Sequence, residues 1–221
     1  CNLKLLGIID RIKLIQLDFT HDNAFADVLC HYNIQEIYHL AAQSSVGYSF
    51  NNPHQTIKEN FNLTANLLEQ VRIVNSNVKF YNAVSSEIFG NQTLLPIVES
   101  SPLNPLSPYG LSKSFSFQIG KLYRDLYEMF ICNGILFNHE SELRRGNFFI
   151  NKIITEAINI RYGDQKIMKV GNLNIKRDFG YAPDYVKAMY LMMQHDKPDD
   201  YIVCSNVSLY LSDILHYVLN K

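Results

Sequence analysis

Residues 78–90 read VKFYNAVSSEIFG, a largely apolar run that ends in the polar Ser85-Ser86-Glu87. The run predicts a buried strand over residues 78–84. On both sides of it, strand-like and helix-like segments alternate along the chain, which is typical of a parallel sheet joined by crossover helices. The sequence therefore predicts an α/β fold with a doubly wound parallel sheet.

The other expected elements follow from apolar periodicity, helix caps and breaker residues. Further strands are expected over residues 12–17, 36–41, 129–137, 166–170 and 201–204. Helices are expected over residues 22–32, 53–74, 109–128, 147–161, 182–195 and 209–219, with Asp22 as a cap and Pro53 in a first turn. Four of the seven prolines lie between Pro96 and Pro108, so an ordered loop is expected there.

The composition excludes several classes of protein. Of the 221 residues, 47% are hydrophobic and 19% are charged, and the net charge of -1 predicts neither nucleic acid nor an anionic membrane as a partner. No apolar run approaches the length of a membrane span, and no secretory signal opens the sequence. Four isolated cysteines and seven histidines without metal-ligand spacing predict free thiols, a cytoplasmic location and no metal site.

Polar residues gather where the expected strands end. In an open α/β sheet, ligands bind beyond the carboxyl ends of the strands. Asp18, residues 41–44, residues 85–87 and Asn138-His139 each come just after an expected strand. We therefore expect the functional site along that edge of the sheet.

Tyr109 and Lys113 are the first candidates for chemistry, because a Tyr-x-x-x-Lys pair lies on one face of a helix. A lysine ammonium lowers the pKa of a neighbouring phenol, and the phenolate can then accept a proton from an alcohol. The same spacing recurs at Tyr162/Lys166 and Tyr217/Lys221. We expect these two to be solvated surface pairs.

The surroundings of Tyr109 distinguish it from the other two tyrosines. Pro108 precedes it, and Ser85 stands 24 positions upstream at the end of a strand. This arrangement resembles the extended short-chain dehydrogenase/reductase family. Glu87 favours a dehydratase within that family. After C4 of a sugar is oxidised, the proton on C5 becomes acidic, and a carboxylate near the serine can remove it and protonate the leaving C6 hydroxyl.

Longer strings follow one another in order and specify the resemblance. They are Leu40-Ala-Ala-Gln-Ser44, Ser85-Ser-Glu-Ile-Phe-Gly90, Ser107-Pro-Tyr-Gly-Leu-Ser-Lys113, Cys132-Asn-Gly-Ile-Leu-Phe-Asn-His-Glu-Ser141, Arg144-Arg-Gly146 and Gly171-Asn-Leu-Asn-Ile-Lys-Arg-Asp-Phe-Gly180. Over essentially the whole chain, the sequence resembles the GDP-mannose 4,6-dehydratases. The resemblance implies a Rossmann-type fold, a lyase that uses NADP rather than NAD, and self-association as a dimer or tetramer. The implied reaction converts GDP-mannose to GDP-4-dehydro-6-deoxy-mannose, a step of GDP-fucose biosynthesis.

The resemblance also implies roles for particular residues. Tyr109 would deprotonate the C4 hydroxyl, Lys113 would hold the ribose and tune Tyr109, Ser85 would bond O4, and Glu87 would drive elimination. These four are the implied catalytic residues. The implied cofactor contacts are Asp18, Phe19, Leu40, Ala41, Ala42, Gln43, Ser44, Tyr109, Lys113, His139, Arg144 and Arg145. The implied substrate contacts are Asn138 and Arg177.

The family begins with a strand and a glycine-rich turn that are not found in these residues. The ten glycines are never closer than the eight positions between Gly163 and Gly171, so no phosphate-binding loop can form from them. We therefore expect a fragment lacking both ends. Residues 1–140 would form a partial dinucleotide-binding domain, and residues 141–221 would mix elements of a smaller C-terminal substrate lobe with returning Rossmann strands. The isolated chain is expected to bind NADP poorly and to be inactive.

Two alternatives to a GDP-mannose dehydratase remain open from the residues. One is a related NAD(P)-dependent epimerase or dehydratase that acts on another nucleotide-sugar. The other is a non-catalytic remnant of the family. The four intact catalytic candidates argue against a remnant. Two departures from the family pattern argue for one: the arginine loop is one residue longer, and Lys152-Ile153 replaces an Arg-Lys pair.

Overall fold

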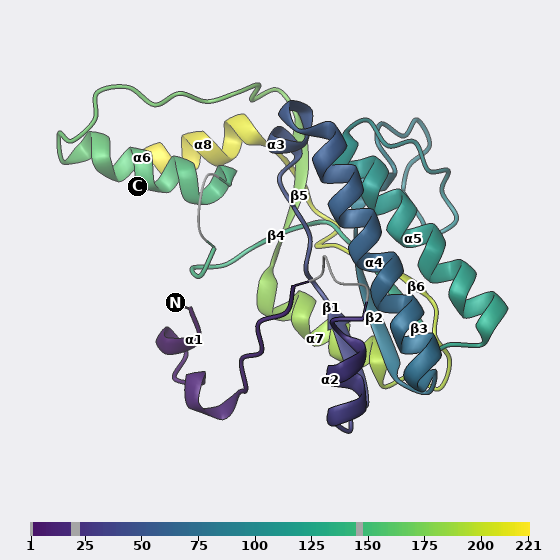
Figure 1. Ribbon diagram of the computed structural model, residues 1–221. Helices are drawn as coiled ribbons and strands as arrows, with labels where there is room; N and C mark the ends of the chain where they lie inside the picture. Colours follow the sequence, from purple (N-terminus) through teal and green to yellow (C-terminus); the bar gives the residue numbers. More distant parts are fainter. Residues whose placement is uncertain (1, 19–22, 145–147) are drawn as a thin grey trace. The chain divides into compact units, whose positions relative to one another are not determined.

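The computed structural model describes residues 2–18, 23–144 and 148–221 of the chain (Figure 1). The chain forms two compact units. Unit 1 comprises Cys1–Leu136 and Lys187–Val203, and unit 2 comprises Phe137–Val186 and Cys204–Lys221.

Unit 1 is built on a four-stranded sheet in the order β1-β2-β3-β6, and every neighbouring pair is parallel. The strands are β1 (Glu36–His39), β2 (Lys79–Ser85), β3 (Ile131–Leu136) and β6 (Asp200–Val203). Parallel neighbours need crossover connections, and helices supply them here. The predicted α/β class with a parallel sheet is confirmed.

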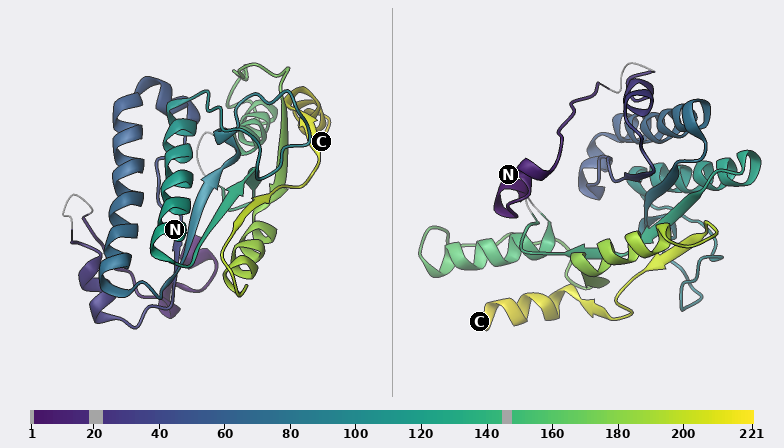
Figure 2. Two further views of the ribbon diagram at one scale, coloured as in Figure 1. Left: turned by 90° about the vertical axis from the view of Figure 1, so that its right-hand side faces the viewer. Right: turned by 90° about the horizontal axis from the view of Figure 1, so that it is seen from below.

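Two long helices cover one face of this sheet, α4 (Pro53–Asn75) and α5 (Pro108–Tyr127), which lie side by side (Figure 2). Each begins with proline in its first turn, where the missing N–H is not needed. The end of α7 (Ala182–Met193) lies on the other face, where the main-chain oxygen of Met193 accepts a bond from Lys79 Nζ at 2.6 Å. Helices on both faces agree with the doubly wound prediction.

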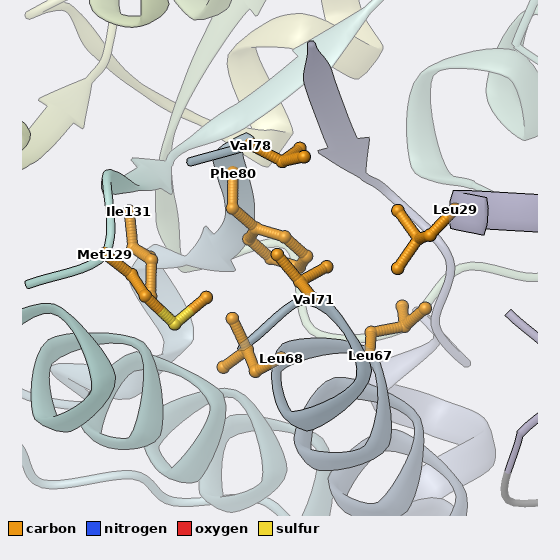
Figure 3. Packing of buried hydrophobic residues seen from close by; sticks show 8 residues of the cluster. All are labelled: Leu29, Leu67, Leu68, Val71, Val78, Phe80, Met129 and Ile131. Carbon is orange, nitrogen blue, oxygen red and sulfur yellow. The ribbon is translucent and has the colours of Figure 1, made fainter. Parts of the chain in front are cut away.

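The main apolar core of unit 1 lies between the sheet and α4 (Figure 3). Phe80, fully buried on β2, faces this helix because alternate residues of a strand point to opposite faces. Around it pack Leu29 of α2 (Ala26–His31), Leu67, Leu68, Val71, Val78, Met129 and Ile131. The next two residues of β2 that face the same side are Asn82 and Val84. The first of these two is polar.

Unit 2 contains a three-stranded sheet in the order β4-β5-β7. The strands are β4 (Asn138–Glu140), β5 (Lys176–Tyr181) and β7 (Ser208–Tyr210), with β4 parallel and β7 antiparallel to β5. Buried Asp178 on β5 accepts bonds from the main-chain nitrogens of Ser205 and Val207, which ties the loop before β7 to the sheet. Helices α6 (Phe149–Arg161) and α8 (Leu211–Leu219) pack on each other.

Two of the predicted strands are wrong. Residues 12–17 are extended but pair with no strand in the described part of the chain, and only α1 (Asn2–Leu5) and a 3-10 turn (Ile9–Arg11) precede them. Residues 166–170 are irregular. A short apolar segment can adopt extended backbone, but a strand also needs a partner for its N–H and C=O groups. The predicted helix over 22–32 begins only at Ala26, and its expected cap, Asp22, lies outside the described residues.

Five α-helices and strands of the described residues were not predicted: α1, α3 (Val46–Asn51), β4, β5 and β7. β4 and β7 have only three residues each, and β5 reads KRDFGY, so none of the three shows an apolar run. Within the described ranges, no helix combines the length and the apolar character needed to cross a membrane. The same residues contain no group of three or more His, Cys, Asp or Glu side chains that could hold a metal ion.

Candidate active site

Ser85 and Glu87 stand at the carboxyl end of β2, in the middle of the parallel sheet. Ser85 is the last residue of the strand, and its Oγ accepts a hydrogen bond from the main-chain nitrogen of Glu87 at 3.3 Å. Glu87 lies in a single 3-10 turn (Ser86–Ile88). The following Ile88 and Phe89 are completely buried and anchor this turn. A hydroxyl and a carboxylate are therefore held close together at the sheet edge where ligands bind in such folds.

The first turn of α5 brings Tyr109 to the same place. The Ser107 Oγ caps the helix by accepting a bond from the main-chain nitrogen of Gly110 at 2.9 Å. A Cβ added to Gly110 would lie 2.7 Å from the main-chain oxygen of Glu87, so only glycine lets the helix start so near this turn. Tyr109 itself is 8% exposed. Ser85 and Tyr109 are 24 positions apart in sequence, but the turn after Ser85 packs directly against the first turn of α5.

Lys113 lies one turn further along α5 and points back to β2. Its Nζ donates to the main-chain oxygen of Ala83 at 2.8 Å, and the residue is 6% exposed. Burial lowers the pKa of this ammonium to about 8. The structure therefore brings together all four residues for which catalytic roles are expected: Ser85, Glu87, Tyr109 and Lys113.

The lowered pKa of Lys113 predicts a pH dependence of stability. The unfolded chain binds this proton more tightly than the folded one, because the lysine pKa falls from 10.5 to about 8 on folding. The free energy of unfolding is therefore expected to rise between about pH 8 and pH 10.5 by roughly 3 kcal/mol from this group. Urea unfolding across this range would be compared with Lys113→Met, in which all other titrations remain. Equal pH slopes for the two proteins would contradict the prediction.

Asn60 is a residue of this site that the sequence analysis missed. It is a buried residue of α4, and its side chain bonds both main-chain groups of Gln43: Oδ1 accepts from the nitrogen at 2.8 Å and Nδ2 donates to the oxygen at 3.0 Å. Nδ2 also lies 3.0 Å from the Oγ of Ser112, the neighbour of Lys113. Asn60 thus holds the loop after β1, with its expected cofactor contacts, against α5. The signal in the sequence was a run of polar residues at helical spacing, Thr56, Asn60 and Thr64, which are buried in the structure.

The loop after β1 contains a further polar atom of interest. Gln43 Oε1 is buried and has no hydrogen-bond partner within the described residues, while its Nε2 donates to the main-chain oxygen of Ser45 at 2.9 Å. Of the other expected contacts in this loop, Leu40 is 57% exposed. Ala41, Ala42 and Ser44 lie in the same irregular segment.

Among the described residues, the other expected cofactor and substrate contacts belong to unit 2, except Asp18. Asp18 is exposed and belongs to unit 1. Burial lowers the pKa of His139, whose Nδ1 lies 2.9 Å from the main-chain oxygen of Phe137. Asn138 Nδ2 donates to the main-chain oxygen of Asp178 at 3.0 Å, and Arg177 is exposed. The two expected contacts that lie outside the described residues are Phe19 and Arg145.

Arg144 and Glu140 form a half-buried pair in unit 2. The Arg144 Nε lies 3.7 Å from Glu140 Oε2, beyond hydrogen-bond distance, and the guanidinium stacks on the ring of Phe148 at 3.5 Å. Burial raises the pKa of Glu140, and the arginine charge opposes this rise. The pair links Arg144 to Glu140, the last residue of β4.

Comparison with known families gives a match over nearly the whole chain. The family model described as GDP-mannose 4,6 dehydratase matches residues 4–220. The relatives include "GDP-mannose 4,6-dehydratase sdnI" of Sordaria araneosa, 38% identical over 200 residues, which cover 90% of this chain and 37% of that protein. The GDP-mannose 4,6 dehydratases of Drosophila melanogaster and Homo sapiens are each 39% identical over 197 residues, 88% of this chain. These residues cover 50% and 53% of the two proteins, so the chain spans about half the length of such relatives.

Solved structures share the fold at lower sequence identity. RMD from Pseudomonas aeruginosa, solved in complex with NADPH, superposes with a TM-score of 0.84 at 21% identity, covering 96% of this chain and 75% of that one. DesIV from Streptomyces venezuelae, a dTDP-glucose 4,6-dehydratase with NAD and TYD bound, gives 0.88 at 20% identity, covering 99% and 66%. At these identities, the likeness establishes the Rossmann-like α/β fold alone.

Proposed function

Because this chain belongs to the GDP-mannose 4,6-dehydratase family, we propose that it carries the catalytic residues of an enzyme that converts GDP-mannose to GDP-4-dehydro-6-deoxy-mannose. The observation that carries the proposal is the packing of the Ser85–Glu87 turn against the first turn of α5. This packing places Tyr109 and Lys113, which together act as the first base, beside the carboxylate of Glu87, which can act as a second one. An enzyme that only oxidises or epimerises a sugar does not need that carboxylate, whereas a dehydratase does.

Each of the four side chains has a task in the proposed reaction. Tyr109 accepts the proton of the C4 hydroxyl, and the Lys113 ammonium stabilises the phenolate that makes this possible. Ser85 donates a hydrogen bond to O4, which holds the sugar in place. Glu87 takes the proton from C5 and delivers it to the C6 hydroxyl, which leaves as water. When the hydride returns to C6, C5 takes up a proton and Tyr109 gives up the one that it accepted from O4, so the net change is the loss of one water.

A nicotinamide cofactor is part of this proposal, and NADP rather than NAD is the form we propose. When bound, it takes a hydride from C4 and returns it to C6. One feature of the described residues fits such a group: Gln43 Oε1 is buried without a hydrogen-bond partner among them, in the loop expected to line the cofactor. Lys113 can also contribute, because its ammonium has three N–H donors and the bond to the Ala83 oxygen uses one of them. The others can donate to a ribose hydroxyl. Isothermal titration with NADP and NAD would compare the two forms.

The test of the function is a direct assay of the protein expressed from its complete open reading frame. Incubation with GDP-mannose should give a product lighter by one water, with a keto group at C4 and a methyl at C6 in the NMR spectrum. UDP- and dTDP-sugars serve as matched substrates. Turnover of one of these instead would assign a related epimerase or dehydratase, and turnover of none would assign a non-catalytic member of the family. A cytoplasmic location belongs to the same proposal.

We also propose that a second copy of the chain packs on α5. Four exposed apolar residues form one stripe along this helix, at spacings of four, seven and four: Leu111, Phe115, Leu122 and Leu126. Ser112, Ser116 and Gly120, on a different side of the same helix, are buried. In a two-fold dimer, both subunits use the same surface patch, so the stripe of one copy can pack against the stripe of the other.

Leu122→Glu is therefore expected to convert the assembled protein to a smaller species, because a carboxylate would be buried at the centre of the contact. Light scattering after size exclusion measures the change. Leu94→Glu is the matched control, since Leu94 is 82% exposed in a loop outside the stripe. An unchanged mass for the Leu122 variant, or an equal change for the control, would count against the proposed contact.

A further inference from the structure

A row of four polar side chains crosses the parallel sheet of unit 1 at one level of its register. His39, Asn82, Asn133 and Asp200 are aligned partners on β1, β2, β3 and β6. Asn82 and Asn133 are completely buried, on the face that otherwise carries the apolar core. A buried amide destabilises a fold unless its polar atoms are hydrogen-bonded, so the partners of this row show what it holds in place.

The amide of Asn82 is bonded to α5 on one side and to β3 on the other. Its Nδ2 donates to the main-chain oxygen of Ser116 at 2.9 Å, and its Oδ1 accepts from Ser116 Oγ at 3.0 Å. Nδ2 also donates to Asn133 Oδ1 at 2.8 Å. Asn82 and Ser116 therefore form a closed pair of hydrogen bonds between the strand and the middle of the helix.

Both ends of the row are anchored, which leaves Asn82 little freedom. Asn133 Nδ2 donates to Asp200 Oδ1 at 2.8 Å, and the same oxygen accepts from Arg124 Nη1 of α5 at 2.9 Å. At the other end, His39 Nε2 lies 3.1 Å from Thr64 Oγ1 of α4, which in turn lies 3.3 Å from Ser116 Oγ. The row is thus a connected network that ties the four strands to α4 and α5.

The network reaches α5 one turn from Lys113. Ala83, the residue after Asn82, provides the main-chain oxygen to which Lys113 Nζ donates. Two consecutive residues of β2 therefore hold two residues of α5 that are three positions apart. The helix is also in direct contact here, since a Cβ on Gly120 would lie 2.7 Å from Asn133 Oδ1.

We infer that Asn82 is a positioning residue for Lys113. Through Ser116 it sets the height and rotation of α5 on β2, and this keeps Nζ at the Ala83 oxygen, one turn from Tyr109. His39 is the titratable group that faces Lys113 from β1. Burial and the lysine charge lower the pKa of His39 to about 3, so it remains neutral and does not repel the ammonium. The part that Lys113 plays in catalysis rests on the proposed function, whereas the placement of its Nζ does not.

The experiment measures the ionisation of Lys113 directly. The amine would be modified in the native protein at a series of pH values, and the extent at Lys113 read by peptide mass spectrometry. Ser116→Ala removes the hydroxyl but leaves the main-chain oxygen that Asn82 also uses. We expect the apparent pKa of Lys113 to rise by about one unit, a tenfold change in its proton affinity, because water reaches a loosened Nζ. Asn82→Ala should give a larger rise.

Ser114→Ala is the matched control, because Ser114 is buried on the same helix and its Oγ accepts a hydrogen bond from Gln118 Nε2 of that helix at 3.4 Å. Its Lys113 should titrate as in the unchanged protein. If Asn82→Ala does not fold, the apparent pKa of Lys113 in Ser116→Ala and in Ser114→Ala still tests the inference. Identical Lys113 titrations in the Ser116 and Ser114 variants would overturn the inference. Because turnover is not measured, this outcome is independent of whether the proposed dehydratase activity is found.

In the protein from the complete open reading frame, a second readout separates positioning from general destabilisation. A misplaced lysine weakens proton transfer by Tyr109, so kcat of the Ser116 variant should fall about tenfold with little change in KM. A loss explained only by unfolding would lower the amount of active protein and leave the pH profile of the remainder unchanged. That second pattern would also overturn the inference.

Discussion

Tyr109→Phe is expected to lower kcat of the complete protein on GDP-mannose by about 10²–10⁴-fold, the range for loss of a general acid or base. The substitution removes one hydroxyl and keeps the ring, which is 8% exposed at the start of α5. The packing of Gly110 on the Glu87 main chain remains, so the fold and the site are preserved. Because the C4 hydroxyl then has no positioned base, oxidation at C4 should be slowed by the same factor.

The control for this variant comes from the same sequence spacing. Tyr162 also stands four positions before a lysine, but it is 77% exposed beyond the end of α6. Tyr162→Phe should therefore leave kcat unchanged. Lys113→Ala should lower kcat as well, and the double variant with Tyr109→Phe should be little worse than Tyr109→Phe alone, since the two residues act as a unit. Multiplying effects would mean that Lys113 works independently of the phenol.

The parts of the site that could be predicted from the sequence are those encoded locally. Pro108-Tyr109 marks a helix start, Ser85 ends a strand and Glu87 follows two positions later. The placement of these residues at element ends therefore depends on short-range rules. The predicted parallel sheet also follows from alternation of elements. In the structure, the strand end and the helix start meet as expected for an α/β fold.

The parts that could not be predicted depend on pairing between distant segments. Asn60 and Gln43 are 17 positions apart, and their contact requires the rotation of α4 about its axis, which is set by packing. Asn82 and Asn133 are 51 positions apart, and they meet only because of the register of β2 on β3. A one-residue shift in that register would move one of them to the other face. Sequence patterns specify which face of an element is buried more readily than the level at which two elements meet.

The two wrong strands have a related cause. Residues 12–17 read IKLIQL and are mostly apolar, as a strand can be, yet β1 has a partner only on its β2 side among the described residues. In contrast, β5 is polar and was missed, although it is the central strand of its sheet, because Asp178 is buried there by accepting two main-chain bonds. Apolar periodicity predicts extended backbone, whereas strand formation is decided by the hydrogen-bond partners that surround it.

Glu87→Gln is the variant that separates the second half of the proposed reaction from the first. Glutamine has the size of glutamate but cannot take the C5 proton, so formation of the dehydrated product should fall by about 10²–10⁴-fold. Tyr109 and Lys113 are untouched, and oxidation at C4 should continue. A 4-keto hexose that has not lost water is therefore expected to accumulate, and trapping its carbonyl before mass spectrometry would detect it.

The contrast between the two variants makes the assignment decisive. Tyr109→Phe should yield little or no trapped ketone, whereas Glu87→Gln should yield a ketone that retains its C6 hydroxyl and, in deuterated water, gains no deuterium at C5. Glu128→Gln, at an exposed position just after α5, is the matched control and should behave as the unchanged protein. If Glu87→Gln still incorporates deuterium at C5, another base removes that proton. The carboxylate beside Ser85 would then serve to hold the sugar, and the case for a dehydratase drawn from its position would be lost.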